Sequence, residues 1–190
     1  MAPDAKGFAT VYDDEVWNVF GFFAYRLRSR ADAEDLTQQT FERALRAWDR
    51  YDPQRASVGT WLVSIARNLL IDHYRRDRSS TQESIDDRLD DRLPAAPGTE
   101  DIDLDIAPDL AAALEGLNQR ERELIALRYG ADMTGPEIAE LTGLTLANVQ
   151  QILSRSLRRM RAELESYEAS GPTPARPTAA TASRQNPDPA

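Results

Sequence analysis

An acidic segment that contains prolines divides this chain into two parts. Residues 79–107 include Pro94, Pro97 and Gly98, and residues 81–110 carry ten Asp and Glu against two Arg, a charge of −8, where the formal net charge of the whole chain is −9. Such a composition buries too little apolar surface to offset the conformational entropy lost on folding. We therefore expect 79–107 to be a flexible acidic linker between two small domains, 1–78 and 108–168.

The first domain has the apolar spacing of helices. Apolar residues recur there at steps of three and four, which predicts three helices. We expect Asp32 to be the N-cap that opens the second helix, and Ser57 to cap the third helix after a break at Pro53.

The second domain carries the start and stop signals of a helix-turn-helix. Two capping boxes are predicted by the pairs Asn118/Glu121 and Thr134/Glu137. Thr145 precedes a long helical run, and Gly143 stands between two amphipathic segments, where a helix should end. Residues 169–190 are rich in Pro, Ala and Thr and are expected to form a disordered tail. The predicted fold class is all-α, two small helical domains joined by a flexible acidic linker.

The long helix of the second domain places polar side chains of the DNA-reading types on one face. Amide and guanidinium groups hydrogen-bond base edges and phosphates in the major groove. A helix that is only solvated on one side also has a polar face. Here the polar face coincides with the turn motif and its caps, and this coincidence favours DNA binding. The residues of this face are Thr145, Asn148, Gln150, Gln151, Ser154, Arg155, Arg158 and Arg159.

The third helix of the first domain has a second polar face, which includes Ser64, Arg67, Asn68 and Arg75. This face is suited to phosphates, with Asn68 able to read a base. Trp61 lies nearby and has two interpretations, stacking on an unpaired base or packing in the core. The second helix carries a polar stripe as well, which from spacing alone is a solvated face.

Several classes of function are excluded by what the chain lacks. It has no cysteine and a single histidine, His73, which rules out disulfides, thiolate chemistry and a Cys/His zinc site. There is no Gly-rich phosphate loop, so we expect no catalytic residues, no metal and no cofactor. No apolar run reaches the roughly 20 residues of a membrane span, and the N-terminus lacks the pattern of a signal peptide. We expect a cytoplasmic protein without membrane insertion and without a small-molecule substrate.

Three segments of the first domain resemble conserved region two of the extracytoplasmic-function (ECF) RNA polymerase sigma factors. They are Ala33-Glu-Asp-Leu-Thr-Gln-Gln-Thr-Phe41, Ala47-Trp-Asp-Arg-Tyr-Asp-Pro53, and Thr60-Trp-Leu-Val-Ser-Ile-Ala-Arg-Asn68 followed by His73-Tyr-Arg-Arg76. The segment from Leu117 to Leu164 is similar to region four of the same family. The two regions occur in the order that the family has.

The resemblance implies three binding surfaces. The helix that carries the polar stripe would dock on core RNA polymerase through Asp35, Leu36, Gln38, Gln39, Phe41 and Glu42. The third helix would hold the minus-ten element through Trp61, Ser64, Arg67, Asn68, Arg75 and Arg76. The eight residues of the second domain's polar face would read the minus-thirty-five element. Gln39 stands where the family usually has a glutamate, and Gln150, Gln151 and Ile152 also depart from the family's pattern.

The function that the resemblance implies is that of an alternative sigma factor. Such a protein binds core RNA polymerase, directs promoter recognition, melting and transcription initiation, and is not itself an enzyme. Its implied partners are core RNA polymerase, promoter DNA and a cognate anti-sigma factor. The alternative from another class is a helix-turn-helix regulator that binds duplex DNA autonomously as a dimer.

Overall fold

A computed structural model describes residues 5–80 and 107–170. The predicted linker falls outside the described residues except at its ends, and so does the predicted tail beyond Ser170. All regular elements of the described residues are helices, which confirms the all-α prediction. In chain order they are α1 (Ala5–Ala24), α2 (Arg30–Arg46), the short 3-10 helix η1 (Trp48–Arg50), α3 (Val58–Ser80), α4 (Pro108–Glu115), α5 (Gln119–Ile125), the π-helical turn η2 (Ala126–Gly130), α6 (Gly135–Thr142) and α7 (Leu146–Ser170).

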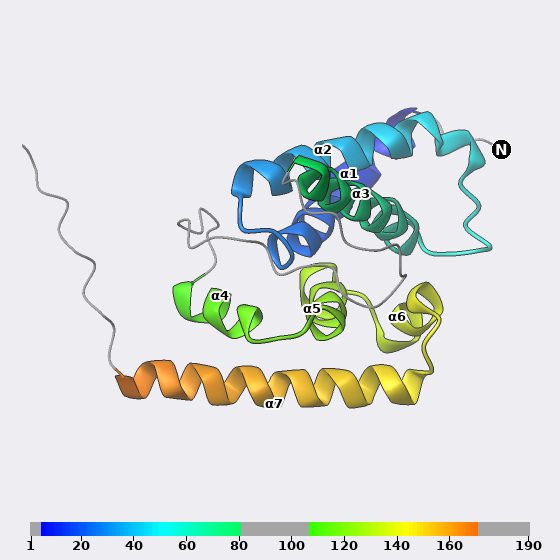
Figure 1. The fold of residues 1–190 in the computed structure, drawn as a ribbon. Helices are drawn as coiled ribbons and strands as arrows, with labels where there is room; N and C mark the ends of the chain where they lie inside the picture. Colours follow the sequence, from blue (N-terminus) through cyan, green and yellow to red (C-terminus); the bar gives the residue numbers. More distant parts are fainter. Residues whose placement is uncertain (1–4, 81–106, 171–190) are drawn as a thin grey trace, which may run out of the picture.

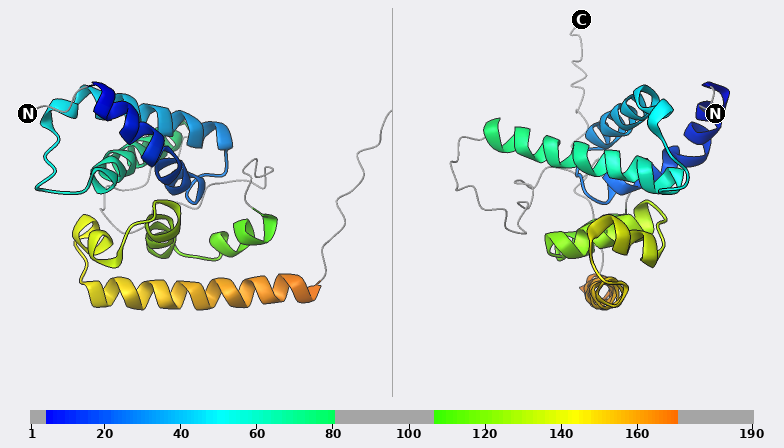
Figure 2. Two further views of the ribbon diagram at one scale, coloured as in Figure 1. Left: turned by 180° about the vertical axis from the view of Figure 1, so that it is seen from behind. Right: turned by 90° about the vertical axis from the view of Figure 1, so that its right-hand side faces the viewer.

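The helices lie in three layers (Figure 1). The first domain, α1 to α3, forms one outer layer, and α4, α5 and α6 form the middle one. The long helix α7 forms the other outer layer. The two further views show the same order of layers (Figure 2). The middle layer therefore lies between α7 and the first domain.

Local signals place most of the helix starts where the sequence predicts them. The backbone N–H of Thr60 donates to the Ser57 hydroxyl at 3.2 Å, as expected of a cap on α3. The prediction of an N-cap at Asp32 is wrong, because α2 begins one turn earlier. Ser29 is its N-cap and accepts a hydrogen bond from the N–H of Asp32 at 3.2 Å. Asp32 instead lies in the first turn, where a negative charge is favourable near the helix N-terminus.

The helix-turn-helix forms as predicted. Both capping boxes are present, one at the start of α5 and one at the start of α6. Gly143 ends α6 in the left-handed region at φ 71°, which lets α7 begin almost at once. Ile138 of α6 and Val149 of α7 are fully buried.

One hydrophobic core joins the two domains. Phe22, Leu62 and Leu69 of the first domain belong to the same buried cluster as Leu127 and Ile138 of the second. A smaller cluster lies between α4, α5 and α7. In the structure the two domains are therefore packed against each other, whereas the sequence indicated only that a linker joins them.

Two glycines allow the domains to approach this closely. A Cβ added to Gly21 of α1 would overlap the carbonyl oxygen of Gly130 in η2. A Cβ added to Gly130 would lie 2.5 Å from the carbonyl oxygen of Gly21, which is closer than real Cβ contacts come. The backbones of α1 and η2 are in direct contact here, which is possible only because both residues are glycine.

We predict that Gly143→Ala lowers the free energy of unfolding by about 1 kcal/mol, because an L side chain in the left-handed region is strained. The cost comes from backbone conformation alone, since nothing lies within 4 Å of the added Cβ. Gly143→Asn should cost less, because Asn tolerates this conformation better than Ala. Urea unfolding followed by circular dichroism measures both variants, and an Ala variant as stable as the wild type would contradict the prediction.

Candidate nucleic-acid interface

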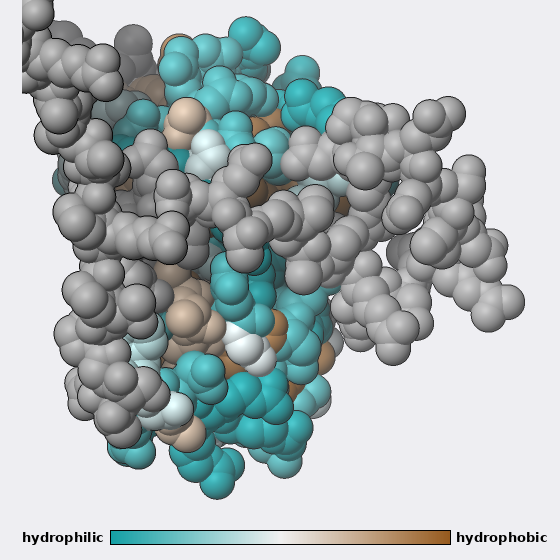
Figure 3. Space-filling view, turned by 60° about the vertical axis from the view of Figure 1, so that its left-hand side comes forward, coloured by the Kyte–Doolittle hydropathy of each residue, from teal (hydrophilic) through white to brown (hydrophobic). Residues whose placement is uncertain are grey.

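The first half of α7 presents most of the polar face predicted for the second domain. Thr145 caps the helix, because the N–H of Asn148 donates to its hydroxyl at 3.2 Å. The exposed side chains that follow are Asn148, Gln150, Gln151, Ser154, Arg155 and Arg158. In the space-filling view, the edge of the molecule along α7 is predominantly hydrophilic (Figure 3). This helix can therefore offer amide and guanidinium groups to a partner on its outer side.

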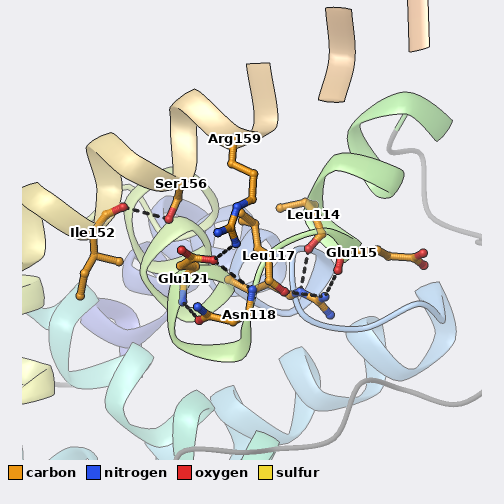
Figure 4. Close-up of polar contacts among 9 residues, drawn as sticks. Leu114, Glu115, Leu117, Asn118, Glu121, Ile152, Ser156 and Arg159 are labelled. Atoms are coloured by element: carbon orange, nitrogen blue, oxygen red, sulfur yellow. Dashed lines mark hydrogen bonds and ion pairs between the residues drawn. The ribbon is translucent and has the colours of Figure 1, made fainter. Parts of the chain in front are cut away.

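Arg159 is held differently from the other arginines of α7. Its Nη1 lies 2.7 Å from Oε2 of Glu121, whose side chain is only 6% exposed (Figure 4). The same oxygen accepts the N–H of Asn118 at 3.0 Å, so the capping box of α5 and the ion pair share one carboxylate. One turn away, the buried Ser156 donates to the carbonyl of Ile152 at 2.9 Å. Arg159 therefore fastens α7 to α5.

Part of the polar face predicted on α3 is open to solvent. Asn68, Arg75 and Arg76 are exposed, and the Nε of Arg76 donates to the carbonyl of Asp72 at 3.3 Å. Ser64 is half-buried and donates to the carbonyl of Trp61 at 2.6 Å, so its hydroxyl is used within the helix. Arg67 is paired with a carboxylate of the second domain.

Trp61 belongs to an aromatic cluster beside this face. Its ring centroid lies 5.0 Å from that of Tyr51 and 5.9 Å from that of Trp48, and Tyr51 and Trp48 are stacked. An open pocket of about 380 Å³ adjoins Trp61 and Tyr51. Its rim includes the exposed Arg55. Neither Tyr51 nor Arg55 was among the predicted site residues, although Tyr51 lies within the segment Ala47–Pro53 that resembles region two.

The second domain contacts the start and middle of α3. Nε of Arg67 lies 2.6 Å from Oε1 of Glu123 in α5. At the first turn of α3, the hydroxyls of Ser57 and Thr60 donate to Oε1 of Glu137 in α6, at 3.1 and 3.2 Å. Sequence reasoning found Glu137 only as a capping residue and gave Glu123 no role, because partners this far apart in the chain leave no local pattern.

Both carboxylates are favoured in their ionised forms. Burial raises the pKa of Glu123, but the charge of Arg67 and its hydrogen bond outweigh that effect, so the net pKa is lowered. The pKa of Glu137 is lowered chiefly by the hydrogen bond from the Thr134 hydroxyl, and the hydroxyls of Ser57 and Thr60 act in the same direction. These contributions are present above the ordinary carboxyl pKa and are lost as the pH falls through the lowered values.

The polar stripe predicted on α2 faces solvent only in part. Asp35, Gln38 and Glu42 are exposed, while Gln39 is half-buried and donates to Oδ2 of Asp35 at 2.6 Å. Leu36 and Phe41 lie in the core, where they fix the helix.

An open groove of about 480 Å³ runs beside these exposed residues, between α1 and α2. It is lined by Gln38 and Glu42 together with aromatic side chains that include Trp17, which is 72% exposed.

The described ranges 5–80 and 107–170 contain neither a cluster of metal-ligating side chains nor a helix that could span a membrane. No three or more His, Asp or Glu side chains are grouped there as metal ligands would be. None of the helices in these ranges has the length and apolar character needed to cross a bilayer.

Comparison with known proteins gives the same two regions. The model of Sigma-70 region 2 matches residues 12–80, and that of Sigma-70 region 4 matches residues 113–162. The chain is 31% identical to the RNA polymerase sigma factor CarQ of Myxococcus xanthus, over 79% of this chain and 84% of CarQ. It is 30% identical to the ECF RNA polymerase sigma factor BldN of Streptomyces coelicolor, over 84% of this chain but only 61% of BldN.

A solved structure shares the fold. The sigma factor RpoE of Bartonella quintana, in complex with the anti-sigma factor NepR, superimposes with a TM-score of 0.65 at 22% identity, over 85% of this chain and 98% of that one. The likeness extends over both domains, since the matched share exceeds either domain alone.

We predict that Arg159→Ala destabilises the second domain by about 1–3 kcal/mol, because it leaves the buried Glu121 carboxylate without its charged partner. Arg155→Ala and Arg158→Ala, on the exposed face of the same helix, should each change stability by no more than about 0.5 kcal/mol. Thermal or urea unfolding of the three variants distinguishes these roles. Equal, small effects at all three positions would show that the pair with Glu121 contributes little.

Proposed function

The chain belongs to the ECF RNA polymerase sigma factors, and we propose that it acts as an alternative sigma factor. It binds core RNA polymerase and directs promoter recognition, melting and transcription initiation. The observation that carries this conclusion is the presence of region 2 and region 4, in that order, in one all-helical chain. The autonomous helix-turn-helix regulator is not favoured, because a sensing or dimerisation domain has no reason to match region 2.

We propose that α2 is the polymerase-docking surface. Its exposed Asp35, Gln38 and Glu42 are polar groups on a helix whose other side is anchored in the core by Leu36 and Phe41. Rigid presentation of this kind reduces the entropy lost on binding. The adjoining apolar groove with Trp17 adds surface of the type that binding hot spots favour.

The two DNA-binding surfaces are assigned to α3 and α7. On α3, exposed Asn68, Arg75 and Arg76 supply a base-reading amide and two phosphate-binding cations beside the aromatic cluster of Trp61, on which an unpaired base could stack. On α7, the exposed amides and arginines are suited to the major groove of duplex DNA. In this proposal 1–78 is the region-two domain, 79–107 the acidic linker, 108–168 the region-four domain and 169–190 a tail.

The remaining partners follow from the same role. All the chemistry of transcription belongs to the polymerase, so the chain itself catalyses nothing and acts in the cytoplasm. An anti-sigma factor is a further partner. RpoE of Bartonella quintana was solved with the anti-sigma factor NepR, and the fold of this chain is also like that of CnrH, solved with the cytosolic domain of CnrY, at a TM-score of 0.56.

The polymerase assignment is tested by titrating the labelled chain with bacterial core RNA polymerase. We expect tight binding that the double variant Asp35→Ala/Gln38→Ala weakens at least tenfold, equivalent to about 1.4 kcal/mol. The matched control is Asp13→Ala/Asp14→Ala, which removes two exposed carboxylates from the neighbouring helix α1. Binding that both double variants leave intact would remove α2 as the docking surface.

The division of labour between α3 and α7 is tested by promoter footprinting with reconstituted holoenzyme. Asn68→Ala should reduce open-complex formation and leave polymerase binding unchanged, because the lost amide contacts only DNA. Arg155→Ala should weaken protection of the upstream duplex by about 1–3 kcal/mol if it contacts a base. An unaltered upstream footprint would exclude Arg155 as a contact, and equal loss of polymerase binding and melting in Asn68→Ala would refute the assignment of α3.

A further inference from the structure

The start of α7 carries no positively charged side chain. Residues 129–154 hold three carboxylates and no Lys or Arg, a charge of −3. This range includes α6, the turn and the first two turns of α7, and the arginines of α7 begin only at Arg155. Lys and Arg supply most of the sequence-independent affinity of proteins for the phosphates of DNA. In this helix-turn-helix, such contacts therefore have to come from the later turns of α7.

One face of α7 points away from the rest of its domain. Val149, Ser156 and Met160 are buried and mark the side that packs against α4, α5 and α6. On the opposite side, exposed residues recur at steps of four, three and four, which places them on one helix face. This outer stripe consists of Ala147, Gln151, Ser154 and Arg158. Because α7 lies on the outside of the described residues (Figure 1), a duplex can approach the stripe directly.

The amide side chains at the start of α7 are available to a ligand. Within the described residues, the side chains of Gln150 and Gln151 make no hydrogen bond, and Asn148 takes part in the helix cap through its backbone N–H. Arg159 of the same helix is instead held by Glu121. An amide offers both donors and an acceptor, so the two glutamines can bond to a base edge without breaking any contact that holds the fold.

The side chains at the start of the outer stripe match the groups that an A·T base pair presents in the major groove. A glutamine amide can accept from N6 of adenine and donate to N7 at once, and a small apolar side chain such as that of Ala147 contacts the C5-methyl group of thymine. Guanine presents two acceptors, O6 and N7, which suit the paired donors of an arginine. Since the first residues of a recognition helix contact the base edges, Ala147 and Gln151 are placed to set the preference.

We propose that the first two turns of α7 read A·T base pairs, in which Gln151 binds adenine and Ala147 contacts a thymine methyl group, while Arg158 binds phosphate. The inference rests on the proposed function for the role of α7 at the minus-thirty-five element. Gln151 is also a position at which the sequence departs from the pattern of its family, so the preference belongs to this chain and is not transferred from its relatives.

The preference is measured by selecting duplexes with reconstituted holoenzyme from a promoter library in which only the minus-thirty-five element is randomised. We expect the parent protein to enrich adenine about tenfold over guanine at one base pair, the discrimination that one bidentate contact provides. An element without any base preference, or one in which guanine is enriched wherever Gln151 has an influence, overturns the inference.

Substitutions at position 151 identify the base that this side chain contacts. At the same base pair, Gln151→Arg should change the enriched base to guanine and Gln151→Glu should change it to cytosine, while Gln151→Ala should abolish the preference. The position is exposed and all three replacements are good helix formers, so the fold is retained. Preferences that stay as in the parent in all three variants would remove Gln151 as a base contact.

Ala162→Arg is the matched control for the added charge. Ala162 is exposed and lies about three turns further along α7, beyond its base-reading end. This variant should bind all duplexes more tightly by a similar factor and keep adenine as the enriched base. A change to guanine in Ala162→Arg as well would show that charge alone explains the result, and the assignment of Gln151 would be lost.

The methyl contact is tested on the DNA. Replacing the thymine that adjoins the adenine with uracil removes only the C5-methyl group. The parent should then bind about fourfold more weakly, and Ala147→Ser, which puts a hydroxyl in place of an apolar surface, should be affected less. Equal losses for the two proteins, or none for the parent, would exclude Ala147 as the methyl contact.

Salt dependence separates the base contact from the phosphate contact. Arg158→Ala should weaken binding of every duplex by a similar factor and reduce the slope of log affinity against log salt concentration by about 1, while Gln151→Ala should leave the slope unchanged. An unchanged slope in Arg158→Ala contradicts its role as a phosphate contact.

The selection also separates this inference from the proposed function. If the holoenzyme melts promoters but its preferences do not depend on Gln151, the inference fails and the proposed function stands. If the chain does not bind core polymerase, the proposed function fails, and the selection is repeated with the free chain. Duplexes retained through adenine in a manner that depends on Gln151 then support the inference, and retention of no preferred sequence overturns it.

Discussion

The contact between the backbones of α1 and η2 is the constraint on which the packing of the two described domains depends. Because Gly21 and Gly130 have no side chains, the two segments come closer than any other pair of residues would allow. That approach brings α5 and α6 over α3, and buried residues of both domains join in one large cluster beside the smaller cluster of α4, α5 and α7. The pairing of Arg67 with Glu123 and the contacts of Glu137 with α3 are consequences of this geometry. The exposed faces of α2 and α7 lie outside it, as do the exposed Asn68, Arg75 and Arg76 of α3.

Local structure was largely predictable, because its causes are local. The capping boxes at Asn118 and Thr134, the cap at Ser57 and the left-handed Gly143 follow from residues within one turn of each other. The one wrong cap, Asp32, lies three residues from the true one at Ser29, and both residue types favour that position. The packing of the domains was not predictable in this way, since its polar partners lie 56 to 93 positions apart in the chain.

In the candidate site, too, some features were predictable from the sequence and others were not. Periodicity identified the polar faces of α3 and α7, but it does not separate an arginine that faces solvent from one that holds the fold together. Arg155 and Arg159 are one turn apart on the same helix, and only the structure shows that Arg159 is paired with a buried carboxylate. The proposed docking role of α2 rests on resemblance alone, since by spacing its polar stripe is indistinguishable from a solvated face.

Glu137 serves two helices in two domains at once. Its carboxylate completes the capping box of α6 through Thr134 and accepts the hydroxyls at the start of α3. This arrangement limits how freely the domains can be exchanged in chimeric proteins. A second domain grafted from a relative carries its own residues at positions 130 and 137, so it would alter how the two domains pack against each other. Chimeras that exchange the second domain should therefore be checked for stability and domain packing, even when both parents fold well.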